Sequence, residues 1–314
     1  MSILSAEYFH DEAKAYEFVE SRIWNHGPVC PHCKARDRIS KMQGKSTRIG
    51  TYKCYSCRKP FTVKVGTIFE SSHITLRLWL QAIFLMSSSK KGISSNQLHR
   101  TLGITLNSAW FMSHRIREAM RSGGLGPMGS GGKIVEVDET FIGCKGDKKQ
   151  TRRGYAHRNA VLTLVSRDGE ARSFHIDRAN TDNIMPIVRA NLAAEAKVVT
   201  DDAGHYRNLD KEFEHAFVNH SAGQYGRGEI HTNTIEGYYS IFKRGMKGIY
   251  QHCSEKHLHR YLAEYDFRYS QRIKLGVNDE QRAEKALKGI VGKRLTYRPS
   301  DREVTNGKTK TTGA

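Results

Sequence analysis

The 314-residue sequence has no apolar run that approaches the ~20 residues of a membrane-spanning helix. Its most apolar stretch, Leu76 to Met86, is interrupted by Arg77 and Gln81. The N-terminal residues are acidic and lack the basic-then-apolar order of a secretory signal. These absences argue against the membrane-spanning and secreted classes, and they predict a soluble intracellular protein.

Acidic residues are scarce relative to basic ones, with 32 Asp and Glu against 51 Lys and Arg. The resulting net charge of +19 and the pI near 9.7 predict an anionic partner, for which nucleic acid is the usual candidate. A membrane surface is the other candidate. No internal repeat is visible, and the length allows two or three domains.

Cysteine is also rare, and four of the six cysteines form two C-x-x-C pairs, Cys30 with Cys33 and Cys54 with Cys57. Each pair puts two thiolates on one side of a metal ion, and two pairs complete a tetrahedral sulfur site that suits structural Zn²⁺. Short strands before and after the second pair give the pattern of a zinc ribbon. The alternative is four unrelated buried cysteines. The two remaining cysteines are interpreted as ordinary reduced thiols.

Two helical regions are predicted around the ribbon. Residues 5–24 are expected to form a short packing helix capped by Ser5. Residues 73–121 are expected to be all-helical, with a turn at Gly103 between two helices that resemble a helix-turn-helix. The basic residues of the second helix are predicted to contact DNA: Arg115, Arg117 and Arg121. The solvated face of an ordinary three-helix bundle is the alternative.

A Gly-rich stretch, residues 122–132, is predicted to be a flexible linker that precedes an α/β core. The predicted core consists of strands at 133–143, 159–166 and 171–176, a helix at 181–194, strands at 197–201 and 216–218, and helices at 234–247 and 254–272. This order of elements is that of an RNase H-like fold. The predicted domains are an N-terminal helix with the zinc ribbon (1–72), the helical segment (73–121), the linker (122–132), the RNase H-like core (133–275) and a basic, loose tail (276–314).

The first core strand, K-I-V-E-V-D-E-T-F-I-G, carries three acids among apolar residues: Glu136, Asp138 and Glu139. A buried carboxylate is costly unless it is paired or bound to a metal. Asp138 is predicted to meet Asp201, at the end of a later strand, and Glu236, in a late helix. Such a trio suits two-metal phosphoryl transfer with Mg²⁺ or Mn²⁺. Glu136 shares a strand face with Asp138 and stays an alternative ligand, whereas Glu139 points the other way and is interpreted as structural or paired with a basic residue.

The sequence resembles the insertion-sequence DDE transposases, in particular the ISXO-type subgroup with an N-terminal zinc ribbon. The resemblance rests on C-P-H-C, C-Y-S-C, V-E-V-D-E-T-F-I-G, T-D-D-A-G-H-Y and H-T-N-T-I-E-G-Y-Y-S-I-F-K-R-G, and it covers about Phe9 to Arg272. It implies divalent metal, DNA cleavage and strand transfer, with Asp138, Asp201 and Glu236 as catalytic metal ligands. Members of the subgroup vary at the third acid, where Asn sometimes replaces Glu, so Asn233 stays an alternative.

In the same resemblance, Lys243 matches the basic residue that follows the third acid. Two helix turns separate it from Glu236 on one face, where it could contact a phosphate. Arg244 and the basic loop from Lys145 to Arg153 are further predicted DNA contacts. The predicted partners are double-stranded DNA, as element ends and target, and further copies of the chain in a homodimer or larger assembly. The alternatives are a DNA-binding regulator with an inactive RNase H-like core and a structure-selective nuclease.

Overall fold

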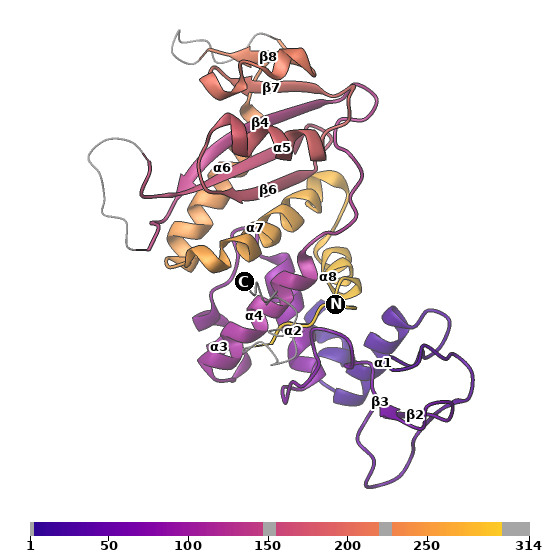
Figure 1. The fold of residues 1–314 in the computed structure, drawn as a ribbon. Helices are drawn as coiled ribbons and strands as arrows, with labels where there is room; N and C mark the ends of the chain where they lie inside the picture. Colours follow the sequence, from indigo (N-terminus) through magenta and orange to yellow (C-terminus); the bar gives the residue numbers. More distant parts are fainter. Residues whose placement is uncertain (1–2, 147–154, 220–227, 297–314) are drawn as a thin grey trace, which may run out of the picture. The chain divides into compact units, whose positions relative to one another are not determined.

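The computed structural model describes residues 3–146, 155–219 and 228–296. The chain divides into two compact units, one comprising Met1–Ala82, Leu98–Ala119 and Leu287–Ala314 and the other Ile83–Gln97 and Met120–Ala286. Figure 1 shows the elements of both units. Within the described ranges, every helix falls short of the length and apolarity needed to cross a bilayer.

The first unit begins with short 3-10 turns and the helix α1 (Glu12–Ile23). Asp11 caps α1, because its side chain accepts a hydrogen bond from the Lys14 N–H at 2.8 Å. The predicted cap at Ser5 is therefore wrong, and the helix is shorter than expected. The 3-10 turns before α1 are Ile3–Ser5 and Glu7–Phe9.

A small three-stranded antiparallel sheet follows, in the order β1-β2-β3. Its strands are β1 (Ile39–Lys41), β2 (Tyr52–Cys54) and β3 (Pro60–Phe61). The hydrophobic cluster beside it contains only three fully buried residues, Cys30, Cys54 and Phe61, with Trp24 and Tyr52 packed against them. So small a core supplies little stabilisation, and a bound metal would contribute much of the folding free energy of this part.

Three helices come next, α2 (Leu76–Ser88), α3 (Ser95–Leu102) and α4 (Leu106–Met120). The Glu12 carboxylate accepts the backbone N–H groups of Leu76 and Arg77, at 2.7 and 3.1 Å, and so caps α2 from α1. The division between the units falls within α2 and again within α3. The predicted helical segment 73–121 is thus helical, but it does not form a separate compact body.

The second unit contains a five-stranded sheet in the order β6-β5-β4-β7-β8, with β4 in the middle (Figure 1). Its strands are β4 (Ile134–Ile142), β5 (Asn159–Ser166), β6 (Ala171–Ile176), β7 (Lys197–Asp201) and β8 (Glu214–Val218). Strands β4, β5 and β6 pair antiparallel, and β7 and β8 are parallel to β4. This topology is RNase H-like, and it confirms the predicted α/β fold class.

Helices cover both faces of the sheet. On one face, Val135 and Val137 of β4 pack in a core with α5 (Thr181–Asn191). On the other face, β5 packs against α6 (Asn233–Gly245) and α7 (Glu255–Ser270). Because side chains alternate along a strand, Glu136 and Asp138 lie on the face that α6 covers. The remaining short elements are 3-10 turns at Gly204–Tyr206, Leu209–Lys211 and Ile273–Leu275 and a π-helical turn at Met246–Tyr250.

Two segments of the predicted domain organisation contain packed residues. In the expected flexible linker, Met128 is 2% exposed, and its backbone bonds with Asn191 and Ala193 attach it to the end of α5. In the expected loose tail, residues Asp279–Lys288 form the helix α8, where the buried Arg282 donates to the Ser87 carbonyl at 3.0 Å. Part of the expected loose tail is therefore helical, and Met128 is packed although the segment around it is Gly-rich. Residues 297–314 of the tail lie outside the described residues.

Candidate active site

The four cysteines of the two C-x-x-C pairs lie together in the first unit. Their Sγ atoms are all within 4.8 Å of one another, and the Cys30–Cys57 and Cys33–Cys54 Sγ pairs are each 3.6 Å apart. With Zn–S bonds of about 2.3 Å, tetrahedral geometry requires sulfur atoms about 3.8 Å apart. The arrangement therefore fits a tetrahedral zinc ion.

The backbone forms a tight turn at each pair. Lys34 and Arg58, which directly follow the second cysteine of each pair, have φ values of 63° and 61°. Non-glycine residues rarely adopt this left-handed conformation, so two equivalent occurrences indicate that the loops are shaped to aim their thiolates at one point.

Asp138 and Asp201 belong to two neighbouring parallel strands. The β4–β7 ladder runs from Ile134 opposite Lys197 to Glu136 opposite Val199, and the same register places Asp138 beside Asp201, two residues beyond the last pair. In the described part of the chain, neither aspartate forms an ion pair. The structure thus brings together two of the three predicted ligands where the strands separate.

The electrostatics of this pair are unfavourable without a cation. Burial raises the pKa of Asp138 from its ordinary value of 3.8 to about 7, and the negative charges of Glu139 and Asp201 raise it as well. Burial likewise raises the pKa of Asp201, while a hydrogen bond from the Ala203 N–H opposes the rise. Two crowded carboxylates, neither in an ion pair among the described residues, suit a hard divalent cation, which would offset both burial and repulsion.

Helix α6 carries the third predicted acid and Lys243. The Tyr239 hydroxyl donates to the Asp138 carbonyl at 2.6 Å and so fixes α6 against β4. The positive charge of Lys243 lowers the pKa of Asp138, and the Lys243 ammonium group lies 5.6 Å from the centroid of the Tyr239 ring. Glu236 is exposed in the first turn of α6 and accepts a hydrogen bond from the Thr232 hydroxyl at 3.1 Å.

The carboxylate of Glu236 does not form a compact group of ligand atoms with the two aspartates. Among the described residues, only the four cysteines form a group of three or more potential ligands with all ligand atoms within 4.8 Å. The alternative third residue, Asn233, is exposed at the start of the same helix.

Glu136, which the sequence left open as an alternative metal ligand, is instead paired inside the protein. It is fully buried and pairs with Arg167 Nε at 3.0 Å and His231 Nδ1 at 3.4 Å. Its other oxygen accepts the Ile235 N–H at 2.9 Å, in the first turn of α6. Both oxygens are therefore used to hold the start of α6 on the sheet. The alternative that Glu136 replaces Asp138 as a metal ligand is contradicted by these contacts.

Glu139 lies on the opposite face of β4 and is paired, as predicted. It accepts the Tyr206 hydroxyl at 2.6 Å and lies 2.8 Å from His205 Nε2. Burial favours the neutral His205 ring, but the hydrogen bond and charge of Glu139 outweigh it and raise the pKa of His205. The sequence analysis did not identify this supporting group, although G-H-Y directly follows Asp201 in the motif.

The prediction that Arg115 and Arg117 contact DNA is wrong for this structure. Arg115 is 4% exposed, and its guanidinium donates to the carbonyls of Ile68, Glu70 and Leu295. Arg117 is 1% exposed and donates to a serine hydroxyl one turn earlier. Burial explains the error, because the helical pattern of α4 shows where basic residues occur but not which side the protein covers.

The other predicted basic contacts differ in accessibility. Arg121 is partly exposed, and Lys243 and Arg244 are exposed. Lys145 is 8% exposed and donates to the Asp177 carbonyl, and residues 147–154 of its loop lie outside the described residues. Accessible basic residues that the sequence analysis did not single out surround the zinc ribbon: Lys34, Arg36, Arg38, Lys41, Lys45, Arg48, Arg58 and Lys59.

Comparison with known proteins agrees with this geometry. Residues 130–270 match the ISXO2-like transposase domain, and residues 10–60 match the transposase zinc-ribbon domain. The chain belongs to the ISXO2-like transposases. The predicted family and the predicted transposase function are thereby confirmed, and nothing in these matches supports the regulator with an inactive core.

The transposase is also similar to individual proteins. A Halobacterium salinarum protein described as an uncharacterized protein in transposable element ISH50 is 26% identical, over 83% of this chain and 91% of the relative. Two solved structures match 69% of the chain and 79% of their own length. They are a pre-cleavage Mos1 transpososome (11% identity, TM-score 0.27) and a Mos1 paired end complex with Mg (14%, 0.24). Scores this low carry no argument about the transposase.

Proposed function

We propose that this transposase binds the ends of an insertion sequence and uses Asp138, Asp201 and Glu236 to catalyse DNA cleavage and strand transfer with Mg²⁺ or Mn²⁺. The observation that carries the proposal is the meeting of Asp138 and Asp201 at the end of the β4–β7 ladder, where none of the described basic side chains forms an ion pair with either of them. Glu236 approaches from α6, which Tyr239 attaches to the Asp138 backbone.

The reaction needs no external energy source. In cleavage, water adds to a phosphorus atom and the 3′ oxygen of the neighbouring nucleotide leaves as a hydroxyl. In strand transfer, that 3′-hydroxyl attacks a phosphodiester of the target, so one bond forms as another breaks. A pair of divalent ions held by the three carboxylates would stabilise the charge on the attacking and leaving oxygens.

The protein's own groups have separable tasks in this proposal. Asp138 and Asp201 hold the cation site from two rigid strands, and the Glu136 contacts keep α6 in register above them. Lys243 is exposed near Asp138 and is suited to bind a phosphate of the strand that enters the site.

Recognition of the element ends is assigned to the zinc ribbon and the helix-turn-helix-like segment. The exposed basic residues of the ribbon supply the positive charge that the buried Arg115 and Arg117 do not. Transposition joins two ends, so we propose that a homodimer or larger assembly acts. A DNA substrate places the protein in the cytoplasm, at the nucleoid.

The test is an assay with purified transposase, Mg²⁺ and DNA duplexes that carry candidate end sequences. Asp138→Asn, Asp201→Asn and Glu236→Gln are expected to bind the ends and to lose both cleavage and strand transfer. Asp202→Asn is the matched control, because Asp202 adjoins Asp201 but is exposed.

The outcomes separate the alternatives. End binding without cleavage by the unaltered protein would indicate a regulator, and cleavage without strand transfer would indicate a nuclease. Cleavage that persists in both aspartate variants would refute the assigned site, and loss of cleavage only in Glu236→Gln and not in Asn233→Ala would settle the third position for Glu236.

A further inference from the structure

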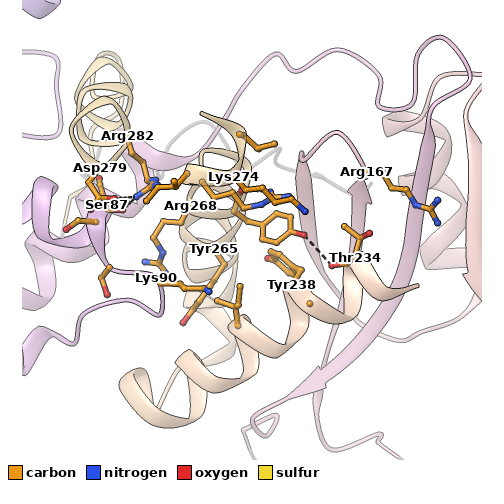
Figure 2. A pocket seen from close by; sticks show the side chains of 18 of the residues that line it. Ser87, Lys90, Arg167, Thr234, Tyr238, Tyr265, Arg268, Lys274, Asp279 and Arg282 are labelled. Atoms are coloured by element: carbon orange, nitrogen blue, oxygen red, sulfur yellow. Dashed lines mark hydrogen bonds and ion pairs between the residues drawn. The ribbon is translucent and has the colours of Figure 1, made fainter. Parts of the chain in front are cut away.

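The second unit contains a cavity of about 860 Å³ that the proposed catalytic roles do not use (Figure 2). It is lined by the end of α2 and the chain after it, by Arg167, by α6, by the end of α7 and the turn that follows it, and by α8. Pockets of roughly 300–1,000 Å³ hold ligands of nucleotide size. A stacked duplex cannot enter such a space, whereas one unpaired nucleotide can.

The cavity carries uncompensated positive charge. Lys90 and Lys274 are exposed on its lining, and no described residue pairs with either ammonium group. Arg272 also lines it, and its guanidinium donates to the carbonyls of Gly169 and Tyr269 rather than to an acid. The other basic lining residues are paired with acids: Arg167 with Glu136, Arg268 with Glu264 and Arg282 with Asp279.

The cavity also offers a stacking surface. The guanidinium of Arg272 lies 3.9 Å from the centroid of the Tyr269 ring, and Tyr269 packs edge-on against Tyr238. The Tyr269 hydroxyl donates to the Thr234 carbonyl of α6, which holds the ring in place. A flat cation on a fixed aromatic ring is a surface on which a nucleobase stacks without regard to its identity.

Helix α6 connects this cavity to the candidate active site. Asn233, Thr234 and Gly237 line the cavity, whereas Glu236 and Lys243 lie on the neighbouring face of the same helix. The cavity and the candidate active site therefore lie on neighbouring faces of one helix.

We propose that this cavity binds one unpaired nucleotide of a DNA strand, with a phosphate between Lys90 and Lys274 and the base on the Arg272–Tyr269 stack. The inference rests on the proposed function, since it takes DNA to be the substrate. The inference adds a binding site for single-stranded DNA to the proposed function. Strands separate when a cleaved end leaves the duplex, and the cavity would hold the freed nucleotide.

The test measures binding of the full-length protein to fluorescent oligothymidylate and to a duplex of equal length, by anisotropy over a range of salt. The double variant Lys90→Glu with Lys274→Glu is expected to bind oligothymidylate roughly tenfold more weakly, and its salt slope should fall by about 0.7, since one single-strand phosphate contact is lost. Duplex binding is expected to change less than oligothymidylate binding. Lys211→Glu, at an exposed lysine on another turn, is the matched control.

A second measurement keeps the test independent of folding. Oligothymidylate with one 5-iododeoxyuridine, irradiated in complex with the unaltered protein, is expected to crosslink to Tyr269 or an adjacent cavity residue. Unchanged oligothymidylate binding by the double variant overturns the proposal, as does an equal loss on the duplex or crosslinking only outside the cavity. If these results occur while the unaltered protein still cleaves element ends, only the cavity assignment fails. If the unaltered protein binds no DNA, the proposed function fails with it.

Discussion

Replacing Asp138 with Asn is expected to abolish DNA cleavage and to stabilise the metal-free protein. In the folded state, burial and the charges of Glu139 and Asp201 raise the pKa of Asp138 from 3.8 to about 7. At about 1.4 kcal/mol per pKa unit, the ionised carboxylate costs the fold up to ~4 kcal/mol above neutral pH. The amide of Asn must also be desolvated, so a net gain of ~1–3 kcal/mol is expected, or a Tm higher by several degrees.

The pH dependence of this gain follows from the direction of the pKa change. The folded state holds the Asp138 proton more tightly than the unfolded chain, so the unaltered protein loses stability as pH rises from about 4 to about 7. Asn does not titrate. The difference in Tm between variant and unaltered protein should therefore be small near pH 4, grow up to pH 7 and stay level above it.

The assay is thermal unfolding in EDTA across this pH range, with Glu136→Gln as the control on the same strand face. That substitution leaves the partly exposed Arg167 without the carboxylate of the buried Glu136, at a cost of up to about 3–5 kcal/mol, the range for a fully buried pair. The two neighbouring variants are thus expected to shift Tm in opposite directions. A lower Tm for Asp138→Asn in EDTA, or a gain that does not depend on pH, would refute the view that Asp138 is held in an unfavourable site for a cation.

Cys54→Ser is expected to release zinc, to unfold the β1–β3 sheet and to weaken binding to the element ends. Unchanged binding to the element ends after zinc loss would show that the ribbon is not a recognition module. Arg115→Ala is expected to lower the free energy of unfolding by a few kcal/mol, because it leaves three backbone carbonyls without their hydrogen-bond donor. A loss of DNA affinity at unchanged Tm would contradict a structural role for the buried Arg115. Burial raises the pKa of Asp266 to about 7, although Ser173 and Tyr238 donate hydrogen bonds to its carboxylate. The ¹³C carboxyl resonance of Asp266 should therefore titrate near pH 7, and the protein should lose the associated stability as pH rises from about 4 to 7. A titration midpoint near pH 4 would contradict this.

Local patterns were sufficient to predict several elements of this transposase. The strands at 159–166 and 171–176 have the bounds predicted from their β-branched and aromatic residues and from the Arg167–Glu170 turn between them. The two C-x-x-C pairs predicted a sulfur cluster, and the order of strands and helices predicted an RNase H-like topology. These features depend on neighbouring residues or on element order, both of which can be read directly along the chain.

The choice among similar residues depended on contacts between distant parts of the chain. Glu136 and Asp138 share a strand face and a residue chemistry, and sequence alone left both open as ligands. Glu136 is excluded by partners 31 and 99 residues away, Arg167 and the Ile235 N–H, which neutralise and hold it. Among the described residues, the Asp138 carboxylate forms no ion pair and accepts only the N–H of the adjacent Glu139, and the charge of Asp201 raises its pKa.

Burial likewise decided the role of the basic residues. The helical pattern of α4 gave Arg115 and Arg117 the same weight as any exposed arginine, but packing against residues far along the chain turned them inward. The sequence by itself thus determined the family, the fold class and the cluster of four cysteines, because short motifs and element order carry them. Only the tertiary structure decided which charges are neutralised inside the protein and which are left for a cation or a DNA phosphate, because the free energy of a charge depends on all the groups that surround it in space.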